Sequence, residues 1–165
     1  MNLKFQIAAP SDAPDLAALR NAVSQHLTSR YGKGNWSSGV TEKGILFDMR
    51  RATVYIVRDR EQPIATLTLS TRKPWAIDKK YFSASARPLY LTGMAIAPAE
   101  QGKGLGRLCL AEALRIAKKW PADAIRLDAY DAKAGAGDFY RKCGFREVGR
   151  ATYRNCPLIY FEMLV

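Results

Sequence analysis

The sequence predicts a mixed α/β fold in which strands and helices do not alternate regularly, as they would in a repeating βα barrel. Three segments with strand character follow one another between residues 53 and 97, with no helical segment between them. Helical segments flank this group on both sides, and 165 residues fit one domain and leave little room for two. We therefore expect one domain over residues 1–165, with the order β-α-α-β-β-β-α-β-α-β-β.

The first half of the chain is expected to contain a strand, two helices and a hairpin. The first strand alternates apolar and polar residues, which is the pattern of a strand with one buried face. Apolar residues at helical spacing follow, with Ser11 as the expected N-cap and acidic residues in the first turn. β-branched and aromatic residues on both sides of a polar turn at 59–63 indicate the hairpin. The expected ranges are Leu3–Ile7, Asp12–Ser29, Thr41–Arg51, Thr53–Val57 and Ile64–Leu69.

The second half begins with a basic segment, residues 71–88, which we expect to be a loop. A strongly apolar run that ends at Pro98 is typical of an interior strand. The best-defined helix of the chain comes next and is ended by Pro121, and Gly144 is suited to cap a later, shorter helix. The expected ranges are Leu89–Ala97, 104–119, Ala124–Ala129, Ala136–Lys142, Phe145–Gly149 and Leu158–Leu164.

The composition narrows the classes of function. The formal charge of +11 makes anions the expected partners, whether nucleic acid, acidic surfaces or phosphorylated small molecules. Because no nucleic-acid-binding motif accompanies the charge, we do not expect a nucleic-acid partner. Three separated cysteines and one histidine do not form a metal-site pattern. Without a long apolar run or the apolar core of a signal peptide, we expect a cytoplasmic protein with no membrane span.

A glycine-rich turn between a strand and a helix, Gln101-Gly102-Lys103-Gly104-Leu105-Gly106, is the most informative stretch. Backbone N–H groups at such a turn lack partners, and the helix dipole adds positive potential, so the turn suits a phosphate. Glycines allow close approach of the phosphate, and Lys103 and Arg107 add charge. The G-x-G-x-G spacing fits the dinucleotide-binding fingerprint poorly, and no Ser or Thr follows Lys103 as in a kinase-type phosphate loop. A tight turn without a ligand remains the alternative.

Two motifs resemble those of the GNAT superfamily of N-acetyltransferases. Gln101–Gly106 resembles the family signature (Gln/Arg)-x-x-Gly-x-(Gly/Ala), and Ile96-Ala97-Pro98 resembles the strand end that precedes it. Phe139–Phe145 resembles the second acetyl-CoA element of the family, a short helix that ends in Tyr-x-x-x-Gly-Phe. Both motifs occur in the expected order, and the resemblance extends over nearly the whole element order from Leu3 to Leu164.

The resemblance implies a fold and an activity. The fold is a mostly antiparallel sheet that splays at the strand which binds the cofactor. The activity is acetyl-CoA-dependent transfer of an acetyl group to the amine of a small molecule or peptide, directly through a ternary complex. Dimerisation is common in the family and leaves a homodimer open, although no residue establishes it. A non-catalytic module that senses acyl-CoA is the alternative function.

The resemblance also implies roles for individual residues. Tyr140 matches the general acid of the family, with a core aromatic as the alternative role. Backbone N–H groups near Met94–Ile96 are expected to polarise the thioester carbonyl, and Gly93 just before them would ease a bulge. Lys133 stands where many members carry Asn, and a phosphate contact and a solvated loop lysine are equally open. The implied cofactor-binding residues are Met94, Ala95, Ile96, Gln101, Gly102, Lys103, Gly104, Leu105, Gly106, Arg107 and Lys133.

Neither the general base nor the acceptor site can be assigned from the sequence. His26, Asp128, Tyr90 and Thr92 are the candidate bases, and a water relay remains open. Acceptor specificity is expected from the first helix, residues 30–51, the basic 71–88 segment and the last hairpin. The aromatic residues that could wall an apolar acceptor pocket, or cover the core from outside, are Trp36, Trp75, Tyr81 and Phe82. The basic charge argues mildly against a polycationic acceptor such as a polyamine.

Overall fold

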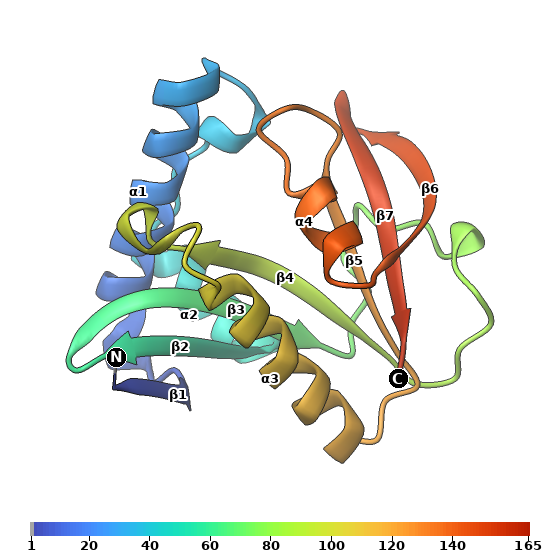
Figure 1. The fold of residues 1–165 in the computed structure, drawn as a ribbon, viewed down its shortest axis with the longest axis horizontal. Coiled ribbons are helices and arrows are strands. Elements are labelled where there is room, and N and C mark those ends of the chain that lie inside the picture. Colours follow the sequence, from blue (N-terminus) through green and yellow to red (C-terminus); the bar gives the residue numbers. More distant parts are fainter. Residues whose placement is uncertain (1) are drawn as a thin grey trace.

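Seven strands form one mixed sheet within residues 2–165, the part of the chain that the computed structural model describes. The strands are β1 (Leu3–Ile7), β2 (Thr53–Asp59), β3 (Gln62–Ser70), β4 (Pro88–Ile96), β5 (Ala124–Tyr130), β6 (Arg146–Tyr153) and β7 (Cys156–Leu164). Their order across the sheet is β1-β2-β3-β4-β5-β7-β6, and only the neighbours β4 and β5 run parallel. The predicted mixed α/β fold with a mostly antiparallel sheet is therefore confirmed (Figure 1).

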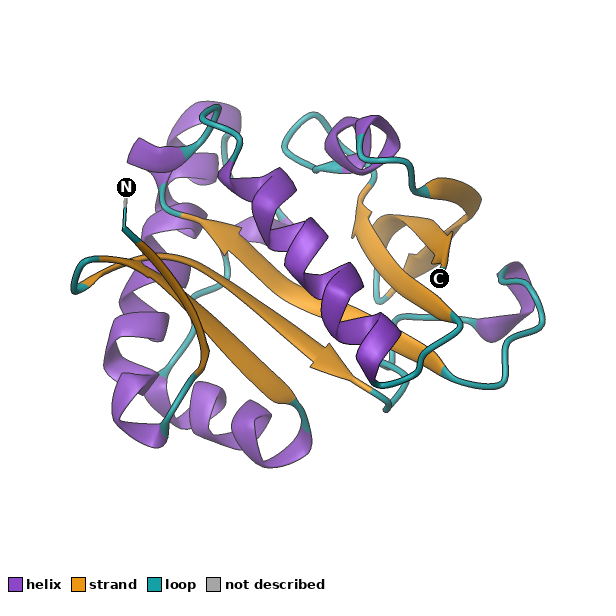
Figure 2. Ribbon diagram, turned by 60° about the horizontal axis from the view of Figure 1, so that its bottom comes forward, coloured by secondary structure: helices purple, strands orange, loops and turns teal. Residues whose placement is uncertain are grey.

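Helices cover both faces of the sheet (Figure 2). The α-helices among residues 2–165 are α1 (Ala13–Tyr31), α2 (Glu42–Arg51), α3 (Leu105–Lys119) and α4 (Gly137–Lys142). The apolar side of α3 packs with buried residues of β3, β4, β5 and β7 in the largest core cluster, to which Tyr140 of α4 also belongs. On the other face, α1 and α2 pack against Val54 and Ile56 of β2. The element order predicted from the sequence is thus confirmed. No helix in the described part of the chain is long and apolar enough to cross a membrane.

The start of α1 corrects one expectation, because Ser11 is not its N-cap. Ser11 lies in a 3₁₀ turn, Pro10–Asp12, and α1 begins one residue after that turn. The carboxylate of Asp12 accepts the N–H of Ala9 at 2.8 Å and pairs with Arg58 of β2 at 2.9 Å. These two contacts favour the tight turn over a simple serine cap, and only the folded chain brings Arg58 to this position.

The sheet splays in its centre, as the resemblance implies. The ladder between β4 and β5 joins only residues 88–90 to residues 124–126, after which the two strands separate. On its other side β4 bulges against β3, because two residues, Gly93 and Met94, stand opposite Leu67 alone. Gly93 has a φ of +57°, a left-handed conformation that glycine adopts without strain, so the expected bulge is present. The separation leaves the last residues of β4 without a strand partner on the β5 side.

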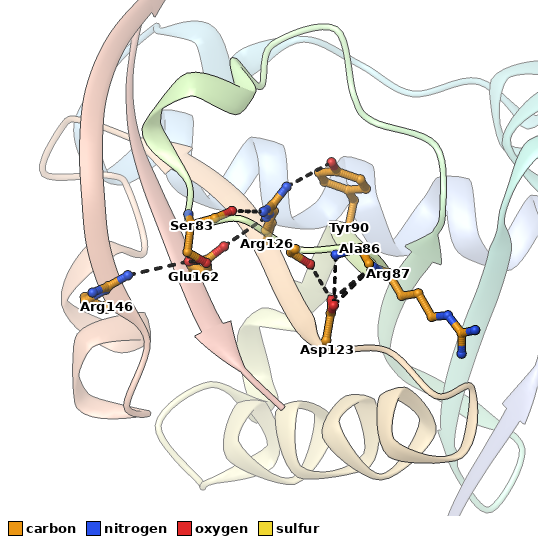
Figure 3. A network of polar contacts seen from close by, with 9 residues as sticks. Ser83, Ala86, Arg87, Tyr90, Asp123, Arg126, Arg146 and Glu162 are labelled. Carbon is orange, nitrogen blue, oxygen red and sulfur yellow. Dashed lines mark hydrogen bonds and ion pairs between the residues drawn. The ribbon is translucent and has the colours of Figure 1, made fainter.

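Two carboxylates hold the segment between β3 and β4 against the sheet (Figure 3). Glu162 of β7 accepts hydrogen bonds from Ser83 Oγ at 2.6 Å and Arg126 Nε at 2.9 Å, and Asp123 accepts the N–H of Ala86 at 2.9 Å. Burial acts to raise the pKa of Glu162, but the hydrogen bonds from Ser83 and Arg126 outweigh it and hold the pKa below its ordinary value. Glu162 and Arg126 are 2% and 4% exposed, so this ion pair anchors the segment inside the protein.

Candidate active site

Two cavities lie beside the splayed strands, with volumes of about 460 Å³ and 710 Å³. Met94 and Ala95 of β4 and Tyr140 of α4 line both of them. Val23 and Leu27 of α1 form a further shared wall. The two cavities therefore meet at the bulged end of β4, and any ligand that reaches from one into the other passes Tyr140.

The larger cavity ends at the glycine-rich turn before α3. Gly102 and Gly104 have φ values of +76° and +87°, and a Cβ built on either would meet no atom within 4 Å, so the space beside their backbone is open. Within residues 2–165, no acceptor bonds to the N–H groups of residues 102–106, and no side chain caps α3. Free amides at the positive end of a helix dipole attract anions. This end of the cavity is thus suited to phosphate.

Basic side chains surround the same cavity. Arg30 of α1, Arg107 of α3 and Lys142 of α4 line it, and so does Lys133 in the loop before α4. Arg107 also donates a hydrogen bond to the carbonyl of Lys142 at 3.4 Å, which links α3 to α4 across the cavity. Four positive charges from three helices and a loop converge there and favour a ligand that carries several negative charges.

Most of the predicted cofactor-binding residues do line the larger cavity. They are Met94, Ala95, Ile96, Gln101, Gly102, Gly104, Gly106, Arg107 and Lys133. Lys103 and Leu105 are not among the lining residues. The side chain of Lys103 pairs at 3.2 Å with Glu100, which lines the cavity, and the side chain of Leu105 is buried in the core with the apolar side of α3. Their backbone N–H groups belong to the free amides of the turn, so their part in cofactor binding stays a prediction.

Tyr140 is enclosed where the cavities meet. It is 8% exposed, and its ring packs against Phe145 and Phe161 at 5.7 Å and 5.8 Å between ring centroids. Its hydroxyl has a weak contact with Met94 Sδ at 3.9 Å. Burial raises the pKa of Tyr140 well above its ordinary value, and the nearby charge of Asp128 raises it further. The phenol therefore stays protonated at neutral pH and is able to donate a hydrogen bond.

Two charged residues line the smaller cavity. Asp128 of β5 lies in a desolvated position, and burial raises the pKa of its carboxyl group. Arg20 of α1 has a half-buried side chain whose guanidinium would lie 3.6 Å from a Cβ built on Gly93. Its ion pair with Asp48 is long, at 3.7 Å. A carboxylate that gains a proton more readily than usual, beside an unreacted amine, is chemically suited to act as a base.

The outer wall of the smaller cavity is the segment after α1, which side chains of α1 hold in place. Asn21 donates to the carbonyl of Val40 at 2.9 Å and accepts its N–H at 2.8 Å. Ser24 donates to the carbonyl of Trp36 at 2.7 Å. The Trp36 ring meets Tyr130 of β5 edge to face at 6.0 Å between ring centroids. The wall is therefore built on a helix and a strand and is not a free loop.

A family model that matches the two cavities and the turn between β4 and α3 identifies the family of the chain. A family model described as "Acetyltransferase (GNAT) family" matches residues 20–145, which are more than half of the chain. The chain belongs to the GNAT acetyltransferase family. The match includes both cavities' shared residues, the glycine-rich turn and Tyr140.

Solved structures with the GNAT fold agree with this chain over nearly their full length, although their sequence identities are low. A ribosomal-protein-alanine N-acetyltransferase from Brucella melitensis has a TM-score of 0.72 and 17% identity over 98% of this chain and 99% of that one. A putative acetyltransferase from Salmonella typhimurium, determined with its cofactor acetyl-CoA, has a TM-score of 0.71 and 14% identity over 99% and 94%. A GNAT acetyltransferase from Listeria monocytogenes reaches 0.74 and 16% identity over 99% and 95%. No curated protein matches the chain significantly.

The four aromatic residues considered for the acceptor site of this GNAT protein do not lie together in the structure. Of the four, only Trp36 lines the smaller cavity. The rings of Tyr81 and Phe82 each lie 5.4 Å from the ring of Tyr160, measured between centroids, and Trp75 is 84% exposed beside a different hollow. The buried ion pair of β5 and β7 anchors the segment between β3 and β4, and none of the residues lining the two cavities comes from this segment or from the last hairpin. Their expected part in acceptor specificity stays a prediction.

The candidate bases also lie in different places: one lines the larger cavity, two line the smaller one, and one lines neither. His26 lines the larger cavity, whereas Asp128 and Thr92 line the smaller one. Tyr90 is 1% exposed and its hydroxyl lies 3.5 Å from Arg126 Nη1, away from both cavities. Asp128 is thus the ionisable candidate that faces the smaller cavity.

Sequence reasoning missed Arg20 and Arg30 as site residues of this GNAT chain. They lie on the stripe of α1 that also carries Val23 and Leu27, and spacings of three and four residues put all four on one side of the helix. The sequence does contain this apolar stripe with an arginine at each end. That the stripe lines a site could not be predicted, because it depends on β4 and β5 separating beside α1, and no local pattern predicts that separation.

Proposed function

We propose that this chain is an acetyl-CoA-dependent N-acetyltransferase that passes the acetyl group directly to the amine of a small molecule or peptide in a ternary complex. One observation carries the proposal: an anion-binding cavity and a cavity with a desolvated carboxylate meet at Tyr140. The acetyltransferase family and the Salmonella protein determined with acetyl-CoA support the cofactor. The Brucella protein, named for an alanine of a ribosomal protein, supports an amine as the acceptor.

The larger cavity fits coenzyme A. Its volume of about 710 Å³ lies within the usual range for ligand pockets, roughly 300–1,000 Å³. The free amides of residues 102–106 and the guanidinium of Arg107 would bind the pyrophosphate, and Lys133, which lines the same cavity, would add positive charge. Ile96 and Phe139 form an apolar stretch between this end and Tyr140, which suits the pantetheine chain. Bound acetyl-CoA would supply the thioester.

Backbone and side-chain donors meet at the junction of the cavities. After the bulge, Met94 and Ala95 have no strand partner on the β5 side, so their backbone is free to stabilise a developing negative charge. Tyr140 holds its proton because of burial. A phenol at its ordinary pKa near 10 already gives up a proton to a thiolate, pKa near 8.5, at a cost of about 2 kcal/mol. With the pKa of Tyr140 raised further, we assign Tyr140 chiefly the donation of a hydrogen bond to the leaving sulfur.

We assign the general base to Asp128. An acceptor amine with a pKa near 10.4 is charged at pH 7, and its neutral form lies roughly 4.6 kcal/mol uphill. The carboxylate of Asp128 attracts the ammonium group, and its raised pKa makes it a better proton acceptor than a solvated aspartate. Its charge also reaches Tyr140, so the base and the hydrogen-bond donor flank the same junction.

Calorimetry with acetyl-CoA and thiol release with a panel of amines test this function. We expect acetyl-CoA to bind, thiol to be released only when an amine is present, and mass spectrometry to find the acetylated amine. Thiol release without any acceptor would contradict direct transfer. An acyl-CoA sensor would bind the cofactor and release no thiol with any amine. Well-folded protein that does not bind acetyl-CoA would refute the proposal altogether.

A further inference from the structure

Two opposite charges face the smaller cavity from different walls, Arg20 from α1 and Asp128 from β5. Both act on Tyr130, which lines the same cavity. Burial raises the pKa of Tyr130, the charge of Asp128 adds to the increase, and Arg20 opposes it. The cation and the anion are therefore both close enough to one side chain to influence it.

Within the part of the chain that the structure describes, Arg20 has only one long ion pair, with the half-exposed Asp48, and Asp128 has none. The contact of Arg20 with Asp48, at 3.7 Å, is too long for a hydrogen bond, and Arg20 donates none to residues 2–165. Asp128 forms no ion pair with any residue in that range, and no other residue donates to its carboxylate. A ligand with only a positive charge would leave Arg20 with no partner but its long contact to Asp48, and a ligand with only a negative charge would leave Asp128 without a cation. The cavity is complementary to a ligand that carries both charges.

We propose that the acceptor is a free α-amino acid, whose ammonium group lies against Asp128 and whose carboxylate is bound by Arg20. This inference rests on the proposed acetyl transfer. Arginine presents a planar fork of donors that matches a carboxylate. The rest of the lining includes Val23, Trp36 and Val40, which offer apolar surface to an amino-acid side chain. The volume of about 460 Å³ is at the lower end of the usual range of ligand pockets, as expected for a small acceptor.

The reaction balances with the groups present. The amine nitrogen forms a bond to the acetyl carbonyl carbon, and the carbon–sulfur bond of the thioester breaks. The ammonium nitrogen loses two protons, of which one passes through Asp128 to solvent and one ends on the thiol of coenzyme A. A peptide N-terminus could undergo the same reaction, but it has no carboxylate beside its ammonium group and would leave Arg20 with only its long contact to Asp48.

Steady-state thiol release with the twenty L-α-amino acids, followed by the carboxamide of the best one, tests the proposal. We expect kcat/KM for the amino acid to exceed that for its carboxamide by roughly 10- to 100-fold, the effect of one hydrogen-bonded charge. Arg20→Gln should bring this ratio toward 1, and Arg20→Lys should restore part of it. Arg72→Gln removes an equal charge from an exposed residue that lines neither cavity, and should keep the ratio.

The outcomes separate this inference from the proposed function. Acetyl transfer to carboxamides or peptides as fast as to amino acids would overturn the amino-acid acceptor and leave the acetyltransferase intact. A ratio that survives Arg20→Gln would overturn the role of Arg20. Binding of acetyl-CoA without transfer to any amine would overturn the proposed function itself. Calorimetry with acetyl-CoA on each variant shows whether the variant is folded.

Discussion

Replacing Gly104 with alanine should weaken acetyl-CoA binding far more than it weakens the fold. Gly104 has a φ of +87°, and a Cβ built there would meet no protein atom within 4 Å. The added methyl group would therefore stand in the open space beside the free amides, where the pyrophosphate must approach. Loss of one hydrogen bond to a charged group costs about 1.5–3 kcal/mol, which corresponds to a roughly 10- to 150-fold rise in Kd.

Gly32→Ala is a matched control for the backbone strain. Gly32 caps the end of α1 with a φ of +82°, also has open space around its Cβ direction, and lines neither cavity. Alanine costs roughly 1–2 kcal/mol in the left-handed conformation of Gly104 and roughly 1–3 kcal/mol at Gly32, whose ψ of −179° lies in a region that is essentially restricted to glycine. Each kcal/mol lowers Tm by about 2–4 °C in a chain of this size. Both variants should therefore melt earlier, Gly32→Ala by at least as much as Gly104→Ala.

Differential scanning calorimetry gives the two Tm values, and titration calorimetry with acetyl-CoA gives the two Kd values. We expect a lower Tm for both variants and a rise in Kd only for Gly104→Ala. An unchanged Kd for Gly104→Ala, or the same rise in both variants, would refute the assignment of the turn before α3 to the pyrophosphate.

Three further predictions concern the junction and the buried ion pair. Tyr140→Phe keeps the packed ring and removes only the hydroxyl. We expect kcat to fall by about 100-fold or more while the Kd for acetyl-CoA stays the same. An unchanged kcat would show that the hydroxyl of Tyr140 takes no part in the reaction. Burial raises the pKa of Asp128, so wild-type kcat/KM should fall as pH drops through that raised pKa. Asp128→Asn should abolish this decrease at acidic pH. A variant that keeps the decrease would exclude Asp128 as the base. The pKa of Glu162 lies below its ordinary value, so its stabilising effect is complete above the unfolded pKa near 4.5 and is lost as pH falls through the lower folded value. Glu162→Gln should therefore cost about 3 kcal/mol in urea unfolding at pH 7, with the difference from wild type shrinking at pH 3; an equal difference at both pH values would mean that the charge of Glu162 does not matter.

Local patterns were sufficient to predict the secondary-structure elements and the anion-binding turn of the candidate site. Period-two and helical spacing, with proline and glycine at the ends, predicted the element order, because these signals arise from neighbouring residues. The turn at 101–106 was predicted as an anion site for the same reason, since free amides at a helix start are a local property. The ion pair between Lys103 and Glu100 was not predicted, because the direction of the turn is set in three dimensions.

The sequence alone thus determined which segments are strands and helices, which turn is suited to a phosphate and which tyrosine matches the family motif. Only the tertiary structure decided what faces that tyrosine. Arg20 and Asp128 are far apart in the chain, and they line one cavity because β4 and β5 separate next to α1. The segment between β3 and β4 is held by a buried ion pair and lines neither cavity. Contacts between distant segments depend on how the sheet twists, bulges and opens, and no pattern of neighbouring residues contains that information.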